Sequence, residues 1–256
     1  MTHPFYDPTL SYDTNFVNGP SLSKNPRYPK RIITKQTKFL GFDVNMPFGM
    51  PAGPLLNAKF VKEAFKLGFD VNCYKTQRTH IVSSNKFPNI LFIDVNGDLT
   101  LEKAEKPLVG KLRTDQAREK FSITNSFGNP SRGPQFWQKD MKKALSYSLP
   151  GQLLISSVCG TLEKGLSEDA YYEDFANAAK MAADTGVKVV ELNLSCPNVA
   201  TEGVVCYTEN AVFEICKRAK EKIGNVHLIA KMGYFAPSQQ ELLERVVKRV
   251  LPFVSA

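Results

Sequence analysis

Short apolar segments alternate along the chain with segments in which apolar residues recur every three or four positions. The short segments, each with the length of a strand, cover residues 46–52, 69–74, 153–158, 187–194 and 226–231. The segments between them have the apolar spacing of amphipathic helices. Strands that alternate with helices predict a parallel sheet with helical crossovers.

Polar residues and glycines mark the ends of the expected helices. Asn57 and Ser167 each precede an apolar stripe and are expected to cap a helix, which a glycine then ends. Ser238 and Glu241 form a capping-box pattern before a further stripe at 242–250. Two architectures fit this alternation, an open doubly wound sheet and a closed (β/α)8 barrel. No GxGxxG sequence follows the first expected strand, which disfavours an open sheet that binds a dinucleotide.

Two segments depart from the alternation. Residues 1–45 are rich in Asn, Pro, Ser and Tyr and are expected to form an irregular lead-in, with a short hairpin at 31–44. Residues 77–124 contain the sequence IDVNGDLTL, which predicts a hairpin around Asn96 and Gly97. We expect 77–124 to be a long inserted loop over the mouth of the site, as is typical of such excursions.

The composition narrows the class of protein. No apolar run approaches the ~18 residues that a membrane helix needs, and the polar N-terminus lacks the apolar core of a secretory signal. The 5 cysteines are an odd number without CxxC spacing, which argues against disulfides and a zinc site. The formal net charge is +8, but Lys and Arg are scattered, which disfavours a nucleic-acid partner. These features favour a soluble, cytoplasmic protein without a metal.

Small or polar residues interrupt the apolar segments at their C-terminal ends. They are Ala52 and Gly53, Lys75, Cys159 and Gly160, Asn193 and Cys196, and Lys231. The C-terminal ends of parallel strands carry the ligands and catalytic residues of α/β folds. One lysine there could simply reach solvent, but two lysines with an Asn and a Cys at one edge favour a functional site.

The most distinctive sequence is ELNLSCPN, residues 191–198. Asn193 and Ser195 are two positions apart, so they can share one face of the emerging strand. Pro197 holds Cys196 in an extended conformation at the start of the loop. A lone cysteine is most often a small buried residue, but this polar setting at a strand end favours a functional thiol.

With this sequence the chain resembles the dihydroorotate dehydrogenases, a family of FMN-dependent (β/α)8 barrels that oxidise dihydroorotate to orotate in pyrimidine biosynthesis. The resemblance implies that Cys196 is the catalytic base and that Asn193 and Asn198 bind the pyrimidine, with Asn193 also next to the flavin. A cysteine base is similar to the soluble branch of the family, whereas the membrane-associated branch has a serine.

Further sequences match the family in the same order along the chain. MPAGPL, with Ala52 and Gly53, resembles the first-strand turn that packs near the flavin. YKT resembles the block whose lysine touches both flavin and substrate, which implies roles for Lys75 and Thr76. IAKMGYF resembles the strand whose lysine lies by the flavin N1–C2 carbonyl, which implies that role for Lys231.

The sequence TNSFGNPSRG resembles the family's Asn-Ser-Met-Gly-Leu-Pro turn, which holds the substrate. The resemblance implies substrate contacts from Asn125 and from the backbone around Phe127, Gly128 and Asn129. Taken alone, two asparagines that flank a glycine fit an ordinary turn equally well.

The residue types suit this chemistry. Oxidation of a dihydropyrimidine needs a hydride sent to flavin N5 and a proton taken from the adjacent carbon, for which a thiolate can serve as the base. A lysine near flavin N1 stabilises the anionic reduced flavin. Asparagine amides offer a donor and an acceptor to the edge of a pyrimidine.

The chain also departs from the family pattern. Family members continue through three more strands, which supply an Asn-Thr or Asn-Ser pair for the substrate and glycine-rich turns for the FMN phosphate. We therefore expect a fragment of a longer protein, with about five of the eight strands of a barrel in residues 46–256. The protein could assemble as a homodimer, which the sequence leaves open.

Three alternatives also stay open. A dihydrouridine synthase-like flavin barrel, which binds tRNA, usually has a Gly-Cys-Pro form of the loop, whereas Ser195 precedes Cys196 here. A dihydropyrimidine dehydrogenase-like reductase has a closely similar loop. The third alternative is an inactive fragment. Lys75 and the TNSFGNP sequence favour a protein that acts on a free pyrimidine.

Overall fold

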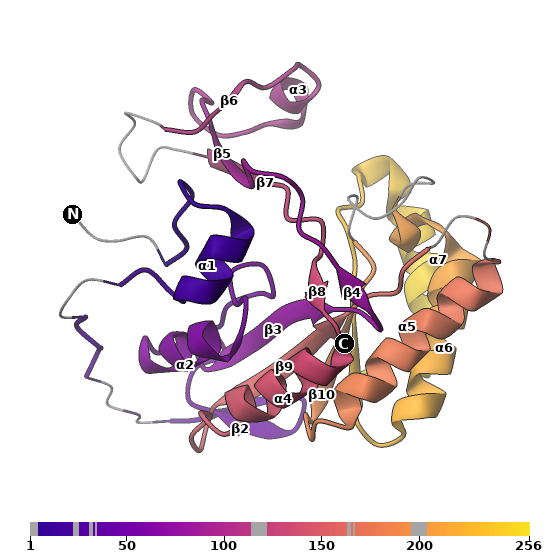
Figure 1. The fold of residues 1–256 in the computed structure, drawn as a ribbon. Helices are drawn as coiled ribbons and strands as arrows, with labels where there is room; N and C mark the ends of the chain where they lie inside the picture. The colour runs from indigo at the N-terminus through magenta and orange to yellow at the C-terminus, as the bar shows by residue number, and fades with distance from the viewer. Residues whose placement is uncertain are drawn as a thin grey trace.

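The computed structural model describes residues 5–22, 26–30, 33, 35–113, 122–162, 165, 167–195 and 204–256. The centre of this described part is a parallel sheet of four strands in the order β11-β10-β9-β3 (Figure 1). The strands are Val71–Gln77 (β3), Leu153–Val158 (β9), Val189–Asn193 (β10) and His227–Lys231 (β11). The last four of the expected strands are therefore confirmed.

The first expected strand, residues 46–52, does not form. This segment runs beside β3 as irregular backbone, and its carbonyl oxygens accept hydrogen bonds from the N–H groups of Asp70 and Cys73, both at 2.9 Å. Pro47 and Pro51 lack an N–H group and cannot donate to a neighbouring strand, which explains why regular pairing fails.

The last residues of the chain lie at the opposite edge of the sheet, beside β11. The Ser255 N–H donates to the Leu228 carbonyl oxygen at 2.7 Å, and the Ala230 N–H donates to the Ala256 carbonyl oxygen at 3.0 Å. This alternation is the hydrogen-bond pattern of a parallel neighbour. Residues 255 and 256 therefore pair with β11 in the manner of a further parallel strand.

Helices pack against the outer face of the sheet (Figure 1). They are α2 (Ala58–Lys66), α4 (Pro134–Leu145), α5 (Glu168–Ala183), α6 (Glu209–Ile223) and α7 (Gln240–Val250). Their apolar residues form the main core with outward-facing strand residues such as Leu154, Leu192 and Leu228. This arrangement of helices over a parallel sheet is the expected α/β class.

Two of the predicted helix caps are confirmed, and the third is wrong. Asn57 and Ser167 accept hydrogen bonds from first-turn N–H groups of α2 and α5, at 3.0 and 3.2 Å, as expected. The capping box predicted at Ser238 is wrong. The side chain that accepts a bond before α7 is that of Gln239, in the 3-10 turn η3 (Pro237–Gln239), from a preceding N–H group at 3.0 Å.

Outside residues 77–124, two α-helices lie where none was predicted. Helix α1 (Tyr12–Asn18) interrupts the N-terminal lead-in, which is therefore not irregular throughout. Helix α4 precedes β9, and half of its twelve positions are polar. Its buried stripe is narrow and consists of Trp137, Met141 and Ala144.

The hairpin predicted at 31–44 is confirmed as β1 (Thr37–Phe39) and β2 (Phe42–Val44). Its apolar side chains form a second, smaller core with inward-facing strand residues such as Leu153 and Val189. This core occupies the N-terminal end of the inner face of the sheet. The opposite, C-terminal end is left for polar groups.

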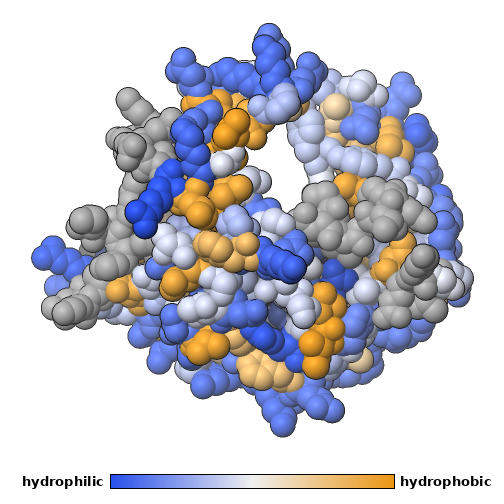
Figure 2. Space-filling model, turned by 45° about the horizontal axis from the view of Figure 1, so that its top comes forward, coloured by the Kyte–Doolittle hydropathy of each residue, from blue (hydrophilic) through white to orange (hydrophobic). Residues whose placement is uncertain are grey.

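The segment between β3 and α4 projects from the body of the molecule (Figure 1). It contains a three-stranded antiparallel sheet, formed by β6 (Gly110–Lys111), β5 (Ile90–Ile93) and β7 (Ser122–Asn125), and at its base β4 (Ile81–Val82) pairs with β8 (Ser131–Arg132). Below this projection the surface has an opening (Figure 2).

The hairpin predicted around Asn96 and Gly97 is wrong. The chain does turn there, with Gly97 at φ 68°, but it then enters the short helix α3 (Leu101–Ala104). Thr100 caps this helix by accepting a hydrogen bond from a backbone N–H group at 3.3 Å. Strand β5 pairs instead with β6 and β7, which come later in the sequence.

Candidate functional site

The inner face of the parallel sheet changes from apolar to polar along the strands. At the N-terminal end it carries Leu153, Ile155 and Val189, packed on the β1–β2 hairpin. Side chains two positions apart point to the same face of a strand. The residues that continue these alternations to the C-terminal end are polar: Ser157, Glu191, Asn193 and Lys231.

Polar side chains from all four strands, joined by Ser195, form a continuous set of hydrogen bonds. The Lys231 Nζ donates to Asn193 Oδ1 at 2.7 Å and also to Ser195 Oγ. The Asn193 Nδ2 donates to Thr76 Oγ1 at 3.4 Å, and this hydroxyl lies 3.0 Å from Ser157 Oγ. These contacts join β11, β10, β3 and β9, so the sheet itself fixes the positions of the groups.

Lys75 lies at the same edge, near the end of β3. The residue is 2% exposed, and its Nζ donates to Asn129 Oδ1 at 3.3 Å. Asn129 is in the turn after β7, and its Nδ2 is buried without a hydrogen-bond partner among the described residues. The turn thus brings a side chain from a distant part of the sequence to the lysine.

The other predicted residues of this turn have different surroundings. Phe127 is buried against the rings of Tyr6 and Tyr12, with centroids 5.4 Å apart in each pair. Gly128 has φ +80°, in the left-handed region that favours glycine. Asn125 is exposed at the end of β7.

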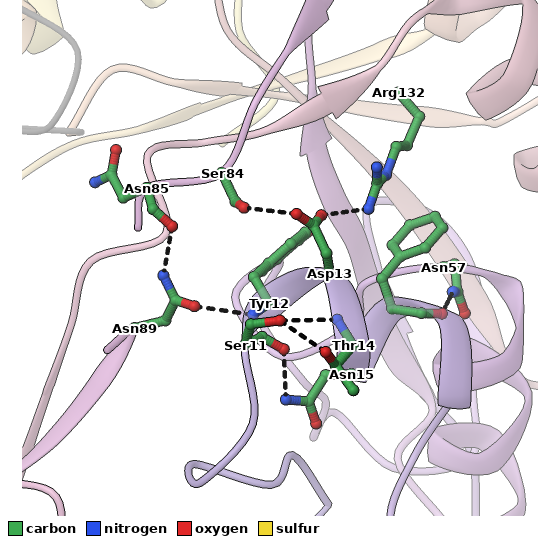
Figure 3. A network of polar contacts seen from close by, with 11 residues as sticks. Ser11, Tyr12, Asp13, Thr14, Asn15, Asn57, Ser84, Asn85, Asn89 and Arg132 are labelled. Atoms are coloured by element: carbon green, nitrogen blue, oxygen red, sulfur yellow. Dashed lines mark hydrogen bonds and ion pairs between the residues drawn. The ribbon is translucent and has the colours of Figure 1, made fainter. Parts of the chain in front are cut away.

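Polar contacts attach helix α1 to the base of the projecting segment (Figure 3). The Asn89 side chain accepts a hydrogen bond from the Tyr12 N–H at 2.8 Å and donates to the Asn85 carbonyl oxygen at 3.0 Å. Asp13 of α1 forms an ion pair with Arg132 of β8. The Asn89 contacts therefore hold helix α1 against the segment that leads to the turn of Asn125 to Asn129. The Asp13–Arg132 pair is solvent-exposed, and pairs of this kind contribute little.

Ala52 and Gly53 follow the irregular segment beside β3. Ala52 is buried in the smaller core. A Cβ atom on Gly53 would meet no described atom within 4 Å. The described residues therefore leave open space beside Gly53, and a bound group can occupy this space.

Cys196 and Asn198 lie outside the described residues. The residues on either side of their loop are held close to β11: the Leu194 N–H donates to the Lys231 carbonyl oxygen at 3.1 Å, and the Cys206 N–H donates to the Leu194 carbonyl oxygen at 3.2 Å. The described residues Leu194 and Cys206 therefore lie beside each other at the C-terminal end of β10, with Leu194 next to Lys231.

Two charged residues at this edge were not predicted. Burial raises the pKa of the Glu191 carboxyl, against the opposing effects of a hydrogen bond with Ser157 and the charge of Lys231. Its Oε1 is buried and has no hydrogen-bond partner in the described part of the chain. Arg78, 2% exposed, donates from Nε to the Asn129 carbonyl oxygen at 3.0 Å. The available signals were a carboxylate within an apolar strand and a basic residue just past a strand end.

Within the described ranges, no group of three or more His, Cys, Asp or Glu side chains is arranged to hold a metal ion. No described helix has both the length and the apolar composition needed to cross a membrane.

The chain is 35% identical over 258 residues to a dihydroorotate dehydrogenase of Dictyostelium discoideum, and the match covers 97% of this chain and 68% of that relative. The chain belongs to the dihydroorotate dehydrogenase family. It is also 37% identical over 130 residues to the catalytic subunit of a dihydroorotate dehydrogenase B (NAD(+)) of Alkaliphilus metalliredigens (strain QYMF), over 50% of this chain and 39% of that relative. No family model matches the chain. The resemblance noted in the sequence is confirmed.

Two crystal structures of DHODH from Eimeria tenella are similar in fold. One is in complex with ferulenol and the other is ligand-free, and their TM-scores are 0.61 and 0.62 at 15% sequence identity. The alignments cover 84% and 88% of this chain but only 56% and 61% of those chains. The chain therefore has the α/β fold of these dihydroorotate dehydrogenases and spans less than two thirds of their length.

The dihydroorotate dehydrogenase family is flavin-dependent, and the inner face suits such a group. The ammonium of Lys231 is hydrogen-bonded to the oxygens of Asn193 and Ser195. Both groups are neutral, so these bonds do not cancel its positive charge. Lys75 brings a second ammonium to the same edge, and the buried Asn129 Nδ2 offers a donor. Cationic and amide donors of this kind match the carbonyl oxygens of a flavin ring and of a pyrimidine.

Proposed function

We propose that this chain provides the flavin- and substrate-binding part of an enzyme that oxidises dihydroorotate to orotate in pyrimidine biosynthesis. The observation that carries the proposal is the meeting of Lys75, Asn193 and Lys231 at the C-terminal ends of three parallel strands. Barrel enzymes hold their substrates at this edge. Both named relatives are dihydroorotate dehydrogenases, which disfavours a dihydrouridine synthase-like or dihydropyrimidine dehydrogenase-like reductase.

We infer that the cofactor is FMN, held across the C-terminal edge of a closed (β/α)8 barrel. Lys231, oriented by Asn193, would lie beside the flavin ring, and Thr76, Ala52 and Gly53 would line the same site. When bound, the flavin supplies the acceptor for the two electrons that leave the substrate. A fixed ammonium beside it stabilises the negative charge that develops there.

The pyrimidine would lie next to Lys75, which also faces the flavin. Dihydroorotate has carbonyl and carboxylate oxygens, and these accept hydrogen bonds from ammonium and amide groups. Lys75 and the Asn129 amide are already joined at 3.3 Å, so they can bind one edge of the ring together. The further proposed contacts are those of Asn125, Asn193, Asn198 and the backbone around Phe127 and Gly128.

Cys196 is the proposed general base. Its thiolate would take the proton from the ring carbon next to the one that loses its hydride, so the proton ends on sulfur and a carbon–carbon double bond forms. Support comes from its place in the ELNLSCPN sequence, directly after Ser195, whose hydroxyl bonds Asn193 at 3.1 Å.

The proposed ligands are small pyrimidines, without a membrane or nucleic-acid partner. A cysteine base is similar to the soluble branch of the family, and on that ground we place the enzyme in the cytoplasm. A homodimer is the assembly we propose.

The decisive experiment mixes the flavin-loaded protein with dihydroorotate without oxygen. Loss of the oxidised-flavin absorbance, with one orotate formed per flavin reduced, is expected. Reduction of the flavin by dihydrouracil or by dihydrouridine in tRNA, but not by dihydroorotate, would instead support one of the other flavin reductases. A flavin that none of these substrates reduces would leave the inactive alternative.

A further inference from the structure

Arg78, which follows β3, joins two loops at the edge of the site. Its Nε donates to the Asn129 carbonyl oxygen at 3.0 Å, and its Nη1 donates to the Gly160 carbonyl oxygen at 2.9 Å and to Thr161 Oγ1 at 2.7 Å. The residue is 2% exposed, so water competes little for these charged hydrogen bonds. One guanidinium therefore ties the turn after β7 to the end of β9.

The surroundings of Arg78 hold it in this arrangement. Its own carbonyl oxygen accepts a hydrogen bond from Trp137 Nε1 at 3.0 Å, which fixes its backbone against α4. Asp174 of α5 accepts from the Thr161 N–H at 2.8 Å and from Thr79 Oγ1 at 2.5 Å. Both the guanidinium and its acceptors on the β9 side are therefore positioned by helices of the core.

Asn129 has a backbone conformation that needs such support. Its φ is 46°, in the left-handed region that residues with a Cβ seldom adopt. Its Oδ1 accepts a bond from Lys75, so the remaining polar group of the side chain is the Nδ2 donor. That donor is buried and has no partner among the described residues. A buried donor without an acceptor is costly, which points to an acceptor on a ligand.

We propose that Arg78 is a positioning residue: it fixes Asn129 so that the Nδ2 of this residue donates to an oxygen of the pyrimidine substrate. The inference rests on the proposed function and names one atom of its substrate site. The acceptor is a carbonyl or carboxylate oxygen, because both groups are present in dihydroorotate and in orotate. Lys75 donates to the Oδ1 of Asn129, and this bond leaves the Nδ2 as the amide atom that faces the ring.

The test measures orotate binding to the flavin-loaded protein through the change in flavin absorbance, which requires no turnover. The variants are Arg78→Met, Arg78→Lys, Asn129→Ala and the double variant Arg78→Met with Asn129→Ala. The matched control is Arg132→Met, because Arg132 lies in β8 just after the same turn but pairs with Asp13 of α1.

Arg78→Met and Asn129→Ala are each expected to raise the Kd of orotate roughly tenfold, the usual effect of losing one well-placed hydrogen bond. The double variant should bind orotate no more weakly than the single variants, since both changes act through one contact. Arg78→Lys should give an intermediate Kd, because an ammonium can keep one of the carbonyl bonds. Arg132→Met should leave the Kd within about twofold, and its effect should add to that of Asn129→Ala.

Two results would overturn the proposal while leaving the proposed function intact. The first is an Arg78→Met variant that binds orotate with wild-type affinity, or a double variant whose loss of affinity equals the sum of the two single losses. The second is loss of flavin and of thermal stability in both Arg78 variants, which would make Arg78 a folding residue. A wild-type protein that neither binds orotate nor is reduced by dihydroorotate would instead refute the proposed function, and with it this inference, before any substitution is made.

Discussion

Lys231 and Asn193 are partners in the backbone register of β10 and β11 and also through their side chains, with Nζ 2.7 Å from Oδ1. Two adjacent parallel strands thus set the position of the ammonium, rather than a loop. A charge that is already in place needs little reorganisation when a ligand binds or reacts. This property suits a group that stabilises negative charge on a flavin.

Lys231→Met is expected to weaken flavin binding and to lower the reduction potential of the bound flavin. Without the ammonium, the reduced, negatively charged flavin loses more stabilisation than the oxidised one does. A decrease of about 30 mV would correspond to about 1.4 kcal/mol for a two-electron couple. Spectroelectrochemical titration of the flavin measures the potential, and flavin content after dialysis measures binding.

Lys248→Met is the matched control for Lys231→Met, because Lys248 is exposed in the last turn of α7. This control should retain the wild-type potential. An unchanged potential in Lys231→Met, with flavin still bound, would contradict the proposed place of Lys231 beside the ring.

Glu191→Gln should reduce the pH dependence of stability. Burial raises the pKa of this carboxyl, so the native state binds the proton more tightly than the unfolded state does. The resulting stabilisation is complete below the unfolded pKa of about 4.3 and is lost as the pH rises through the folded pKa. The groups that act on Glu191 are Cys73 and Lys75 of β3, Ser157 of β9 and Lys231 of β11.

Urea unfolding of the wild type and of Glu191→Gln at a series of pH values tests this. The free energy of unfolding of the variant should improve relative to the wild type as the pH rises, because glutamine stays neutral. A difference that is the same at every pH would show that Glu191 does not titrate with folding.

Asn89→Ala is expected to destabilise the fold by about 1–3 kcal/mol, since it leaves buried backbone groups without partners. The Asn89 side chain accepts from the Tyr12 N–H at 2.8 Å and donates to the Ser126 carbonyl oxygen at 3.1 Å. Urea unfolding measures the loss. Ser84→Ala, which removes a single 3.3 Å bond to Asp13, should change stability by less than about 0.5 kcal/mol. Equal effects of the two changes would mean that the Asn89 contacts contribute little.

The sequence predicted the elements whose signal is local. Strand β9 was expected at 153–158 and has these bounds, because a continuous apolar run needs no distant partner to be recognised. Asn57 caps α2 because its side chain can bond only a nearby N–H group. The antiparallel pairing of β5 with β6 and β7 was missed, since it joins segments whose contact depends on the tertiary fold.

The placement of the candidate residues was predictable to the same extent. The sequence placed Lys75, Asn193 and Lys231 at one edge because a polar residue at the end of an apolar strand is visible in it, and a parallel sheet brings such residues together. Arg78 and Glu191 were missed. A charged residue is normally exposed, and only the tertiary structure shows that these two are buried.

Cys196→Ala should leave flavin bound but slow its reduction by dihydroorotate by a factor on the order of 10²–10⁴, the usual contribution of a positioned general base. Cys196→Ser should retain part of the rate with a pH optimum shifted upward, because a hydroxyl is much harder to deprotonate than a thiol. The control is Cys216→Ala: burial raises the pKa of the Cys216 thiol of α6 to about 12, so it stays protonated, and its removal should leave the rate unchanged. Rapid-mixing absorbance of the flavin separates these cases. Wild-type flavin reduction in Cys196→Ala would make Cys196 a packing residue and would leave the reaction without its proposed base.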